Sequence, residues 1–216
     1  MVLIAASGIV RDGLGSQVAV KLALEHFTQG AIEFLAQNAT AVLPPDQLAL
    51  EVIENSFRRA NTAVYSFGHK LAAGGRMAAA LQGLVIANRC IAAGRVGPGS
   101  AYLLRGQEIF PFFAISDEER QVPIQPERCV GAQSLVSVEL ASVELEPGDL
   151  IVMVGRFLNF QEELLLQDSA ELLRQSAGNL IPILEDLFGP GWFGDYAGVV
   201  RVGEAAIYLA RGDQLV

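Results

Sequence analysis

The sequence predicts an α+β protein built on antiparallel sheets, and three observations support this class. Two long segments in the first third of the chain, 16–36 and 48–72, carry apolar residues at helical spacing. From residue 77 onward the pattern changes to short apolar runs separated by turn residues. After two further helical segments the chain ends in two more short runs. Runs of strands and runs of helices that do not alternate one by one indicate the α+β class.

The helices are recognised by their spacing and their boundary residues. Ser16 is a suitable N-cap for the first long helix. The prolines of Pro44-Pro45-Asp46 separate it from the second, which Gly74-Gly75 should end near Ala72. Shorter helices are expected at 161–175 and 179–188.

The strands are recognised by short apolar or alternating runs between turns. A wholly apolar run predicts a central strand at Leu150–Val154, and alternation predicts another at 135–140. The apolar cluster at 110–113, Phe-Pro-Phe-Phe, is expected to be a core strand rather than a partner site. The full set of expected strands is 2–6, 80–86, 89–93, 101–105, 108–113, 135–140, 150–154, 197–202 and 205–210.

Length and composition favour one packed domain spanning 1–216. The 216 residues are 51% hydrophobic and 18% charged, a composition that excludes intrinsic disorder. No repeat or Gly/Ser linker marks a boundary. No apolar stretch approaches the roughly 18–20 residues that span a bilayer, and the N-terminus lacks the basic region of a secretory signal, so we expect a cytoplasmic protein.

Charge and cysteine content exclude further classes. Fifteen Lys and Arg stand against 24 Asp and Glu, giving a net charge of -9 that repels phosphate backbones and anionic lipids. We therefore expect no nucleic-acid partner and no membrane partner. Cys90 and Cys129 have no CxxC spacing and are expected to be reduced thiols, and neither His26 nor His69 has an acidic or cysteine neighbour at ligand spacing.

Three segments carry a more specific signal. Residues 59–65 read Arg-Ala-Asn-Thr-Ala-Val-Tyr, residues 100–105 read Ser-Ala-Tyr-Leu-Leu-Arg, and residues 145–153 read Leu-Glu-Pro-Gly-Asp-Leu-Ile-Val-Met. In this order they resemble the AN..IY helix, the strand after the GDSR turn and the L.PGD.LLL segment of the PPM-type, metal-dependent protein phosphatases (type 2C). Residues 6–15 also resemble that family's ADGMGGHG.G segment. The likeness covers most of the chain and implies a four-layer α-β-β-α sandwich of two antiparallel sheets flanked by helix pairs.

In that family two Mn²⁺ or Mg²⁺ ions, held by carboxylates, activate a water and clamp the phosphoryl oxygens. The resemblance places the first metal-binding Asp on Ser7, with Gly8 retained, and the Asp of SDG on Arg156. The Asp of GDSR falls on Pro98, and the GTT segment reads Met-Ala-Ala at 77–79. A hydroxyl is a weak neutral ligand and a guanidinium repels a cation, so the resemblance implies an eroded metal site.

Two carboxylates remain as candidate ligands. Asp195 nearly matches the family's last metal-binding Asp, within one or two residues of register. Asp12, in Asp12-Gly13-Leu14-Gly15, resembles a DGMG motif in a less favoured alignment, and as a loop residue before a helix it also suits the helix dipole. We also expect the guanidinium of Arg156 to neutralise Asp195 or to bind an anion.

These interpretations lead to a main hypothesis and two alternatives. The first is a catalytically inactive protein-phosphatase-like domain, a pseudophosphatase, that binds a protein partner such as a kinase or a phosphoprotein, or forms a homodimer. No cofactor is then expected. The alternative is an active serine/threonine phosphoprotein phosphatase with an atypical Mn or Mg site, and the third is a module that shares only the architecture. The family's preceding strand has no counterpart here, so the run 205–210 or a second chain is expected to cover the exposed sheet edge.

Overall fold

The computed structural model describes residues 1–11, 13–40, 42–71, 77–116, 119–120, 125–176, 180–204 and 206–213. The chain forms two compact units. The first comprises Met1–Pro98 and Val122–Glu144, and the second comprises Gly99–Gln121 and Leu145–Val216. Each unit contains one antiparallel sheet with helices, which confirms the α+β class expected from the sequence.

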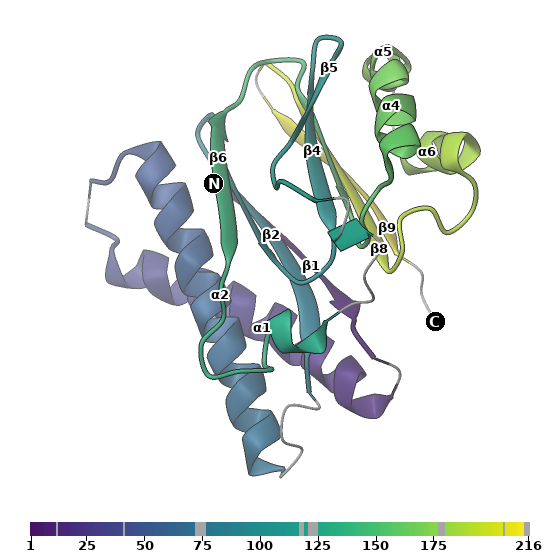
Figure 1. The fold of residues 1–216 in the computed structure, drawn as a ribbon. Helices are drawn as coiled ribbons and strands as arrows, with labels where there is room; N and C mark the ends of the chain where they lie inside the picture. Colours follow the sequence, from purple (N-terminus) through teal and green to yellow (C-terminus); the bar gives the residue numbers. More distant parts are fainter. Residues whose placement is uncertain are drawn as a thin grey trace. The chain divides into compact units, whose positions relative to one another are not determined.

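The first unit contains a four-stranded sheet and two long helices (Figure 1). The strand order is β1-β2-β3-β6, and every neighbouring pair is antiparallel. Its elements are β1 (Val2–Ile9), α1 (Leu14–Gln37), α2 (Pro45–Lys70), β2 (Ala79–Ala87), β3 (Cys90–Val96) and β6 (Glu139–Glu144), with a short 3-10 helix at Pro126–Arg128.

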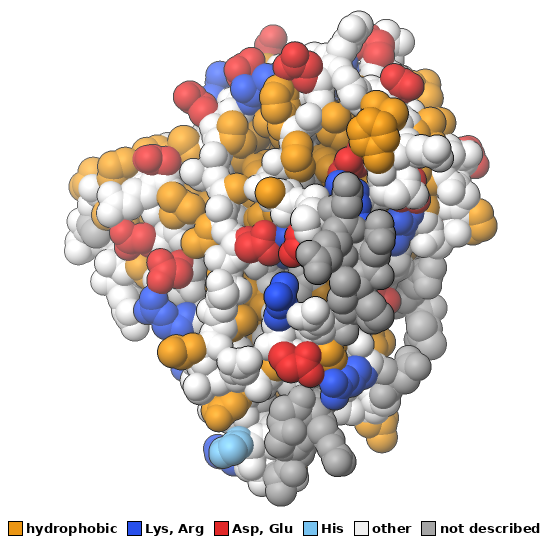
Figure 2. Space-filling model, in the orientation of Figure 1, with side chains coloured by type: hydrophobic (Ala, Val, Ile, Leu, Met, Phe, Trp, Pro, Cys, Tyr) orange, Lys and Arg blue, Asp and Glu red, His pale blue; other side chains and the backbone are white. Residues whose placement is uncertain are grey.

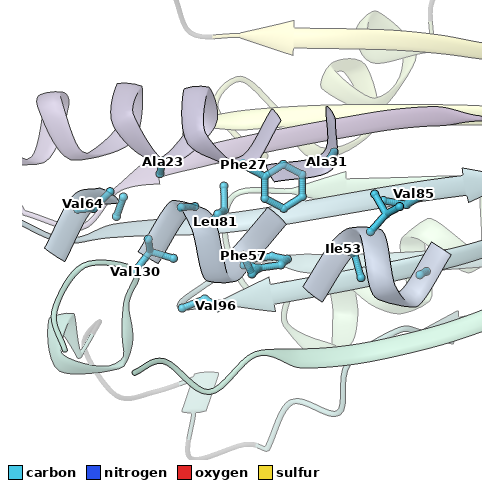
Figure 3. Close-up of a cluster of buried hydrophobic side chains, with 14 of the residues drawn as sticks. Ala23, Phe27, Ala31, Ile53, Phe57, Val64, Leu81, Val85, Val96 and Val130 are labelled. Carbon is cyan, nitrogen blue, oxygen red and sulfur yellow. The ribbon is translucent and has the colours of Figure 1, made fainter. Parts of the chain in front are cut away.

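Helices α1 and α2 cover one face of this sheet and enclose the first core (Figure 3). Phe27 of α1 and Phe57 of α2 meet edge to face at 5.1 Å between ring centroids. Glycines in the strands make room for these rings: a Cβ at Gly83 would lie 2.3 Å from Phe27, and one at Gly94 would lie 2.4 Å from Phe57. The rings therefore fit against the sheet only because two strand positions lack side chains.

Asn61, from the segment that resembles the AN..IY signature, fixes the loop before β6. Its side-chain oxygen accepts a 2.8 Å hydrogen bond from the Gly131 N–H, and its amide nitrogen donates to the carbonyls of Gln133 and Ser134 at 3.1 Å. A buried amide with both ends satisfied holds the loop on α2.

The second unit contains a five-stranded sheet in the order β5-β4-β7-β8-β9, again entirely antiparallel. Three helices pack on one of its faces, through a cluster that includes Tyr102, Leu150, Leu173 and Trp192. The elements are β4 (Ser100–Arg105), β5 (Glu108–Pro111), β7 (Leu150–Val154), α4 (Phe160–Asp168), α5 (Ala170–Gln175), α6 (Ile181–Phe188), β8 (Tyr196–Val202) and β9 (Ile207–Asp213).

Asp149, in the turn before β7, is a structural residue. Its buried carboxylate receives the Arg105 guanidinium at 2.7 and 3.0 Å and the Glu146 N–H at 2.8 Å. This ties the turn to the end of β4.

Three sequence expectations need correction. The strand expected at 135–140 lies instead at Glu139–Glu144, because pairing with β3 sets its register. The helix expected at 161–175 is divided into α4 and α5 at Ser169. The expected core strand at 110–113 ends at Pro111, and although Phe113 is buried, Phe110 is 44% exposed at the edge of its sheet. None of the helices in the described residues has the length and apolar character needed to cross a bilayer.

Candidate functional site

In the first unit the candidate positions at the end of β1 use their polar groups locally. Ser7 pairs with Leu81 in the ladder with β2, and its hydroxyl donates a 2.6 Å hydrogen bond to the Ala80 carbonyl. Gly8 lies opposite Ala80 and is buried. The Ser7 hydrogen is therefore already engaged by the backbone of the neighbouring strand.

Pro98 lies in the Gly97-Pro98-Gly99 connection from β3 to β4, where both glycines have positive φ, 83° and 140°. Proline offers no side-chain oxygen to a cation. At the start of β2, Ala79 exchanges backbone hydrogen bonds of 3.0 Å with Val130, so the segment at 77–79 contributes packing and backbone pairing.

In the second unit the structure brings the segments containing Arg156 and Asp195 together. The Gly155 N–H lies 2.8 Å from the Phe193 carbonyl and 3.0 Å from the Tyr196 carbonyl. A Cβ at Gly155 would lie 3.1 Å from the Asp195 backbone nitrogen, and a Cβ at Gly194 would lie 3.5 Å from the Arg156 Cβ. The turn after β7 and the turn before β8 therefore touch through their backbones, as the resemblance implied.

The guanidinium of Arg156 is held by a carboxylate that the sequence interpretation missed. Nη2 and Nη1 lie 2.5 and 3.0 Å from the two carboxylate oxygens of Glu162, in a bidentate ion pair. Nη1 also donates to the Phe157 carbonyl at 3.0 Å, and Nε donates to the Trp192 carbonyl. We call Arg156, Glu162 and these two carbonyls the Arg156 clamp.

Glu162 is fixed from the helix as well as from Arg156. It lies in the first turn of α4, where Asn159 and Glu162 form a capping box: the Asn159 side chain accepts the Glu162 N–H at 3.0 Å, and the Glu162 carboxylate accepts the Asn159 N–H at 2.8 Å. Burial raises the pKa of Glu162, but the hydrogen bonds from Arg156 and Asn159, with the charges of Arg156 and Arg120, outweigh it and hold the pKa below its ordinary value. The carboxylate therefore stays ionised against the guanidinium.

The adjacent residue of α4 anchors a second cluster. Glu163 accepts a 2.7 Å hydrogen bond from the Tyr102 hydroxyl and pairs with Arg120 at 2.8 Å. Burial and the bond to Glu163 raise the pKa of the Tyr102 phenol, so it remains a neutral donor. Behind the clamp, the Ser100 hydroxyl donates to the Arg156 carbonyl at 2.9 Å. The first turn of α4 is thus a junction of ion pairs that fixes the segment after β7.

The described residues do not fit a two-metal centre. At the positions where the resemblance implies family carboxylates, the chain has a hydroxyl engaged by a carbonyl, a proline and a cation in a salt bridge. No group of three or more His, Cys, Asp or Glu that could hold a metal ion is found among the described residues. Asp195 is exposed at the turn before β8, and Asp12 lies outside the described residues.

One signal for Glu162 was present in the sequence. Asn159-Phe160-Gln161-Glu162 has the spacing of a capping box, which predicts that the Glu162 carboxylate, six residues beyond Arg156, folds back onto the helix start. No comparable local signal links Arg120 or Tyr102 to Glu163, because more than forty residues separate either partner from it along the chain.

Solved structures provide the comparison, since no protein-family profile and no curated protein matches the sequence. PppA, a key regulatory component of T6SS in Pseudomonas aeruginosa, is 14% identical; the match covers 86% of this chain and 78% of that chain, with a TM-score of 0.62. The serine/threonine phosphatase PstP of Mycobacterium tuberculosis is 19% identical; the match covers 94% of this chain and 100% of that chain, with a TM-score of 0.57. The catalytic domain of PstP in complex with two manganese ions is 18% identical; the match covers 98% of this chain and 99% of that chain, with a TM-score of 0.54.

At these identities the likeness concerns the fold alone. It agrees with the two antiparallel sheets, the helices that cover them and the order of the elements along the chain. The chain therefore has the fold of the PPM-type serine/threonine phosphatases.

Proposed function

We propose that this chain is a catalytically inactive phosphatase-like module that acts by binding a protein partner. The Arg156 clamp carries the proposal. At the position where the resemblance implies a metal-binding carboxylate, a guanidinium makes a bidentate ion pair with Glu162 and donates to two backbone carbonyls. All of its described contacts are structural, and its charge opposes a divalent ion.

Two further observations support loss of the metal site. A metal-bound water is activated only where several oxygens, mostly anionic, hold the ion; the Pro98 side chain supplies no oxygen and Ser7 supplies only a neutral hydroxyl. Asp195 alone cannot balance two divalent charges.

A binding role is favoured by what the same fold does elsewhere. PppA, whose structure is similar, is described as a key regulatory component, and this supports a regulatory role here. We infer a kinase or a phosphoprotein as the class of partner. On the face in Figure 2, Lys and Arg side chains lie among Asp and Glu rather than in one basic patch, which favours a protein partner over nucleic acid.

The test is a calorimetric titration of the full chain with Mn²⁺ at neutral pH, followed by hydrolysis of p-nitrophenyl phosphate with and without the metal. We expect no binding up to millimolar Mn²⁺ and no metal-dependent hydrolysis. The PstP catalytic domain, whose structure holds two manganese ions, is the positive control.

The alternative function is an active Mn- or Mg-dependent phosphoprotein phosphatase with an atypical site, which the shared fold favours. Micromolar Mn²⁺ binding together with metal-dependent turnover would establish it and refute the proposal. In that case alanine substitutions of Asp12 and Asp195 should each abolish binding, since these are the carboxylates that remain near family positions.

A further inference from the structure

Strand β1 forms an open edge of the first sheet (Figure 1). It pairs with β2 over its whole length, from Val2 opposite Ile86 to Ile9 opposite Ala79. Within the described parts of the chain, no strand pairs with its other side. The C-terminal strand β9 pairs with β8 in the second unit, so it does not cover this edge. Every second residue of an edge strand turns its N–H and C=O away from the sheet, so between Val2 and Gly8 the outward groups of β1 take no part in the ladder with β2.

The four edge strands of the two sheets differ in how they are protected. Charged side chains occupy both ends of β6, which reads Glu-Leu-Ala-Ser-Val-Glu. The edge strand β5 is only four residues long and contains Pro111. Proline, charge and shortness are the usual devices that prevent edge-to-edge pairing. In contrast, β1 reads Val-Leu-Ile-Ala-Ala-Ser-Gly-Ile over eight residues, with no charge and no proline.

The side chains of β1 are also incompletely covered. Leu3 and Ala5 pack against the first core but remain half-buried. Val85, the partner of Leu3 on β2, is 0% exposed. The difference arises because β2 has a strand on each side, whereas β1 has one. An added strand would bury this apolar surface as well as satisfy the backbone groups.

We propose that β1 is a homodimer interface, in which it pairs antiparallel with β1 of a second copy of this chain. The occupant must be uncharged and apolar on both faces of the sheet, since both faces of β1 are apolar, and an identical strand meets this requirement. Antiparallel pairing of two identical edges has two-fold symmetry and closes, so it yields a dimer rather than a fibre. The inference is independent of whether the chain hydrolyses phosphoesters.

The symmetry restricts the register. Residues directly opposite one another in an antiparallel pair point to the same face, so a two-fold axis perpendicular to the sheet must pass through a residue pair rather than between residues. Centring on Ala5 or on Ala6 pairs seven of the eight residues of the strand; we place the axis at Ala5, so that Ala5 lies opposite its own copy, Leu3 opposite Ser7, and Ile4 opposite Ala6. Two four-stranded sheets then become one continuous sheet. A single eight-residue edge buries less than a standard interface, so we expect a dissociation constant of roughly micromolar order.

The experiment is sedimentation equilibrium of the full chain over a concentration series reaching about 100 μM. We expect a mass that rises from the 23.0 kDa of one chain toward twice that value. Ala5→Lys places like charges directly opposite one another in the dimer and should raise the dissociation constant at least tenfold. Leu140→Lys, on the edge strand β6, is the matched control and should leave it unchanged.

A second variant gives a positive signal. Ala5→Cys puts two thiols directly opposite in the proposed register and should give a disulfide-linked dimer under mild oxidation, faster than the wild-type chain does through Cys90. If Ala5→Lys does not fold, as judged by circular dichroism, the cross-linking result stands in its place. A wild-type chain that stays at 23.0 kDa throughout, a dimer that persists in folded Ala5→Lys, or Ala5→Cys that links no faster than wild type would each overturn the proposal.

Discussion

The Arg156 clamp makes a quantitative prediction about stability. Arg156→Met keeps most of the aliphatic volume but removes the bidentate pair with Glu162 and the two bonds to backbone carbonyls. The side chain of Arg156 is 33% exposed and that of Glu162 is 23% exposed, so the pair lies between the surface and the buried case. Exposed pairs contribute about 0.5 kcal/mol, whereas breaking a buried pair costs about 3–5 kcal/mol.

We therefore expect Arg156→Met to lower the free energy of unfolding by about 2 kcal/mol. For a chain of this length that corresponds to a fall in Tm of roughly 4–8 °C. In a double-mutant cycle with Glu162→Gln, the coupling energy should be about 1 kcal/mol, because Glu162 keeps its hydrogen bond from the Asn159 N–H when Arg156 is removed.

Urea unfolding followed by circular dichroism measures these differences. Arg58→Met is the matched control: Arg58 pairs with Glu54 at the same 2.5 Å, but the two side chains are 67% and 52% exposed. Loss of the Arg58–Glu54 pair should lower the free energy of unfolding by no more than about 0.5 kcal/mol. Equal losses for Arg156→Met and Arg58→Met, or a coupling energy indistinguishable from zero, would show that the clamp does not hold the turn after β7 in place.

Three further predictions concern acidity, packing and thiol reactivity. The pKa of Glu162 lies below its ordinary 4.5 in the folded chain, so the contribution of its charge to the free energy of unfolding is fully present above about pH 4.5 and is lost as the pH falls through the lowered pKa. Urea unfolding of Glu162→Gln at a series of pH values should no longer show this loss of stability in acid. An unchanged pH profile would contradict the prediction. Gly83→Ala should lower the free energy of unfolding by about 2–3 kcal/mol, since the new Cβ would lie 2.3 Å from the buried ring of Phe27. Gly198→Ala is the control: its Cβ would lie 3.5 Å from the nearest neighbouring atom, and its thermal melt should resemble that of the wild-type chain. Burial raises the pKa of the Cys129 thiol to about 12, so this thiol should not react in the folded chain. An aromatic disulfide reagent at pH 8 should therefore modify only Cys90 in the folded chain and both cysteines in denaturant. Rapid reaction of both thiols in the folded chain would refute this.

Elements with an unambiguous hydrophobic pattern could be predicted from the sequence. The run Leu150–Val154 forms β7 with the expected bounds, because a wholly apolar run of five residues between turns is too short for a typical helix and favours a buried strand. The alternation at 135–140 was less informative. Val136 and Val138 do pack against the first core, but the strand begins at Glu139, whose carboxylate meets the buried Arg95 of β3. Alternation reports which side chains face inward, while the strand bounds are set by a partner that the local sequence does not contain.

The candidate site was predictable to a similar extent. The resemblance placed Arg156 and Asp195 in neighbouring turns, and the structure brings those turns together at Gly155. The resemblance did not predict which carboxylate the Arg156 guanidinium pairs with. Glu162 binds Arg156 because the capping box has already oriented its carboxylate near the guanidinium, and this preorganisation becomes visible only when the helix start and the turn are seen together.

The Arg156 clamp also constrains how this site can change over evolutionary time. Glu162 closes the capping box of α4 and neutralises Arg156, so it serves two structural purposes at once. If Arg156 changed to aspartate, two like charges would face each other where an ion pair now lies, and the helix start would be weakened. If Glu162 changed first, the guanidinium would lose its counter-ion. An acidic residue at position 156 is thus accommodated only by paired substitutions at both positions.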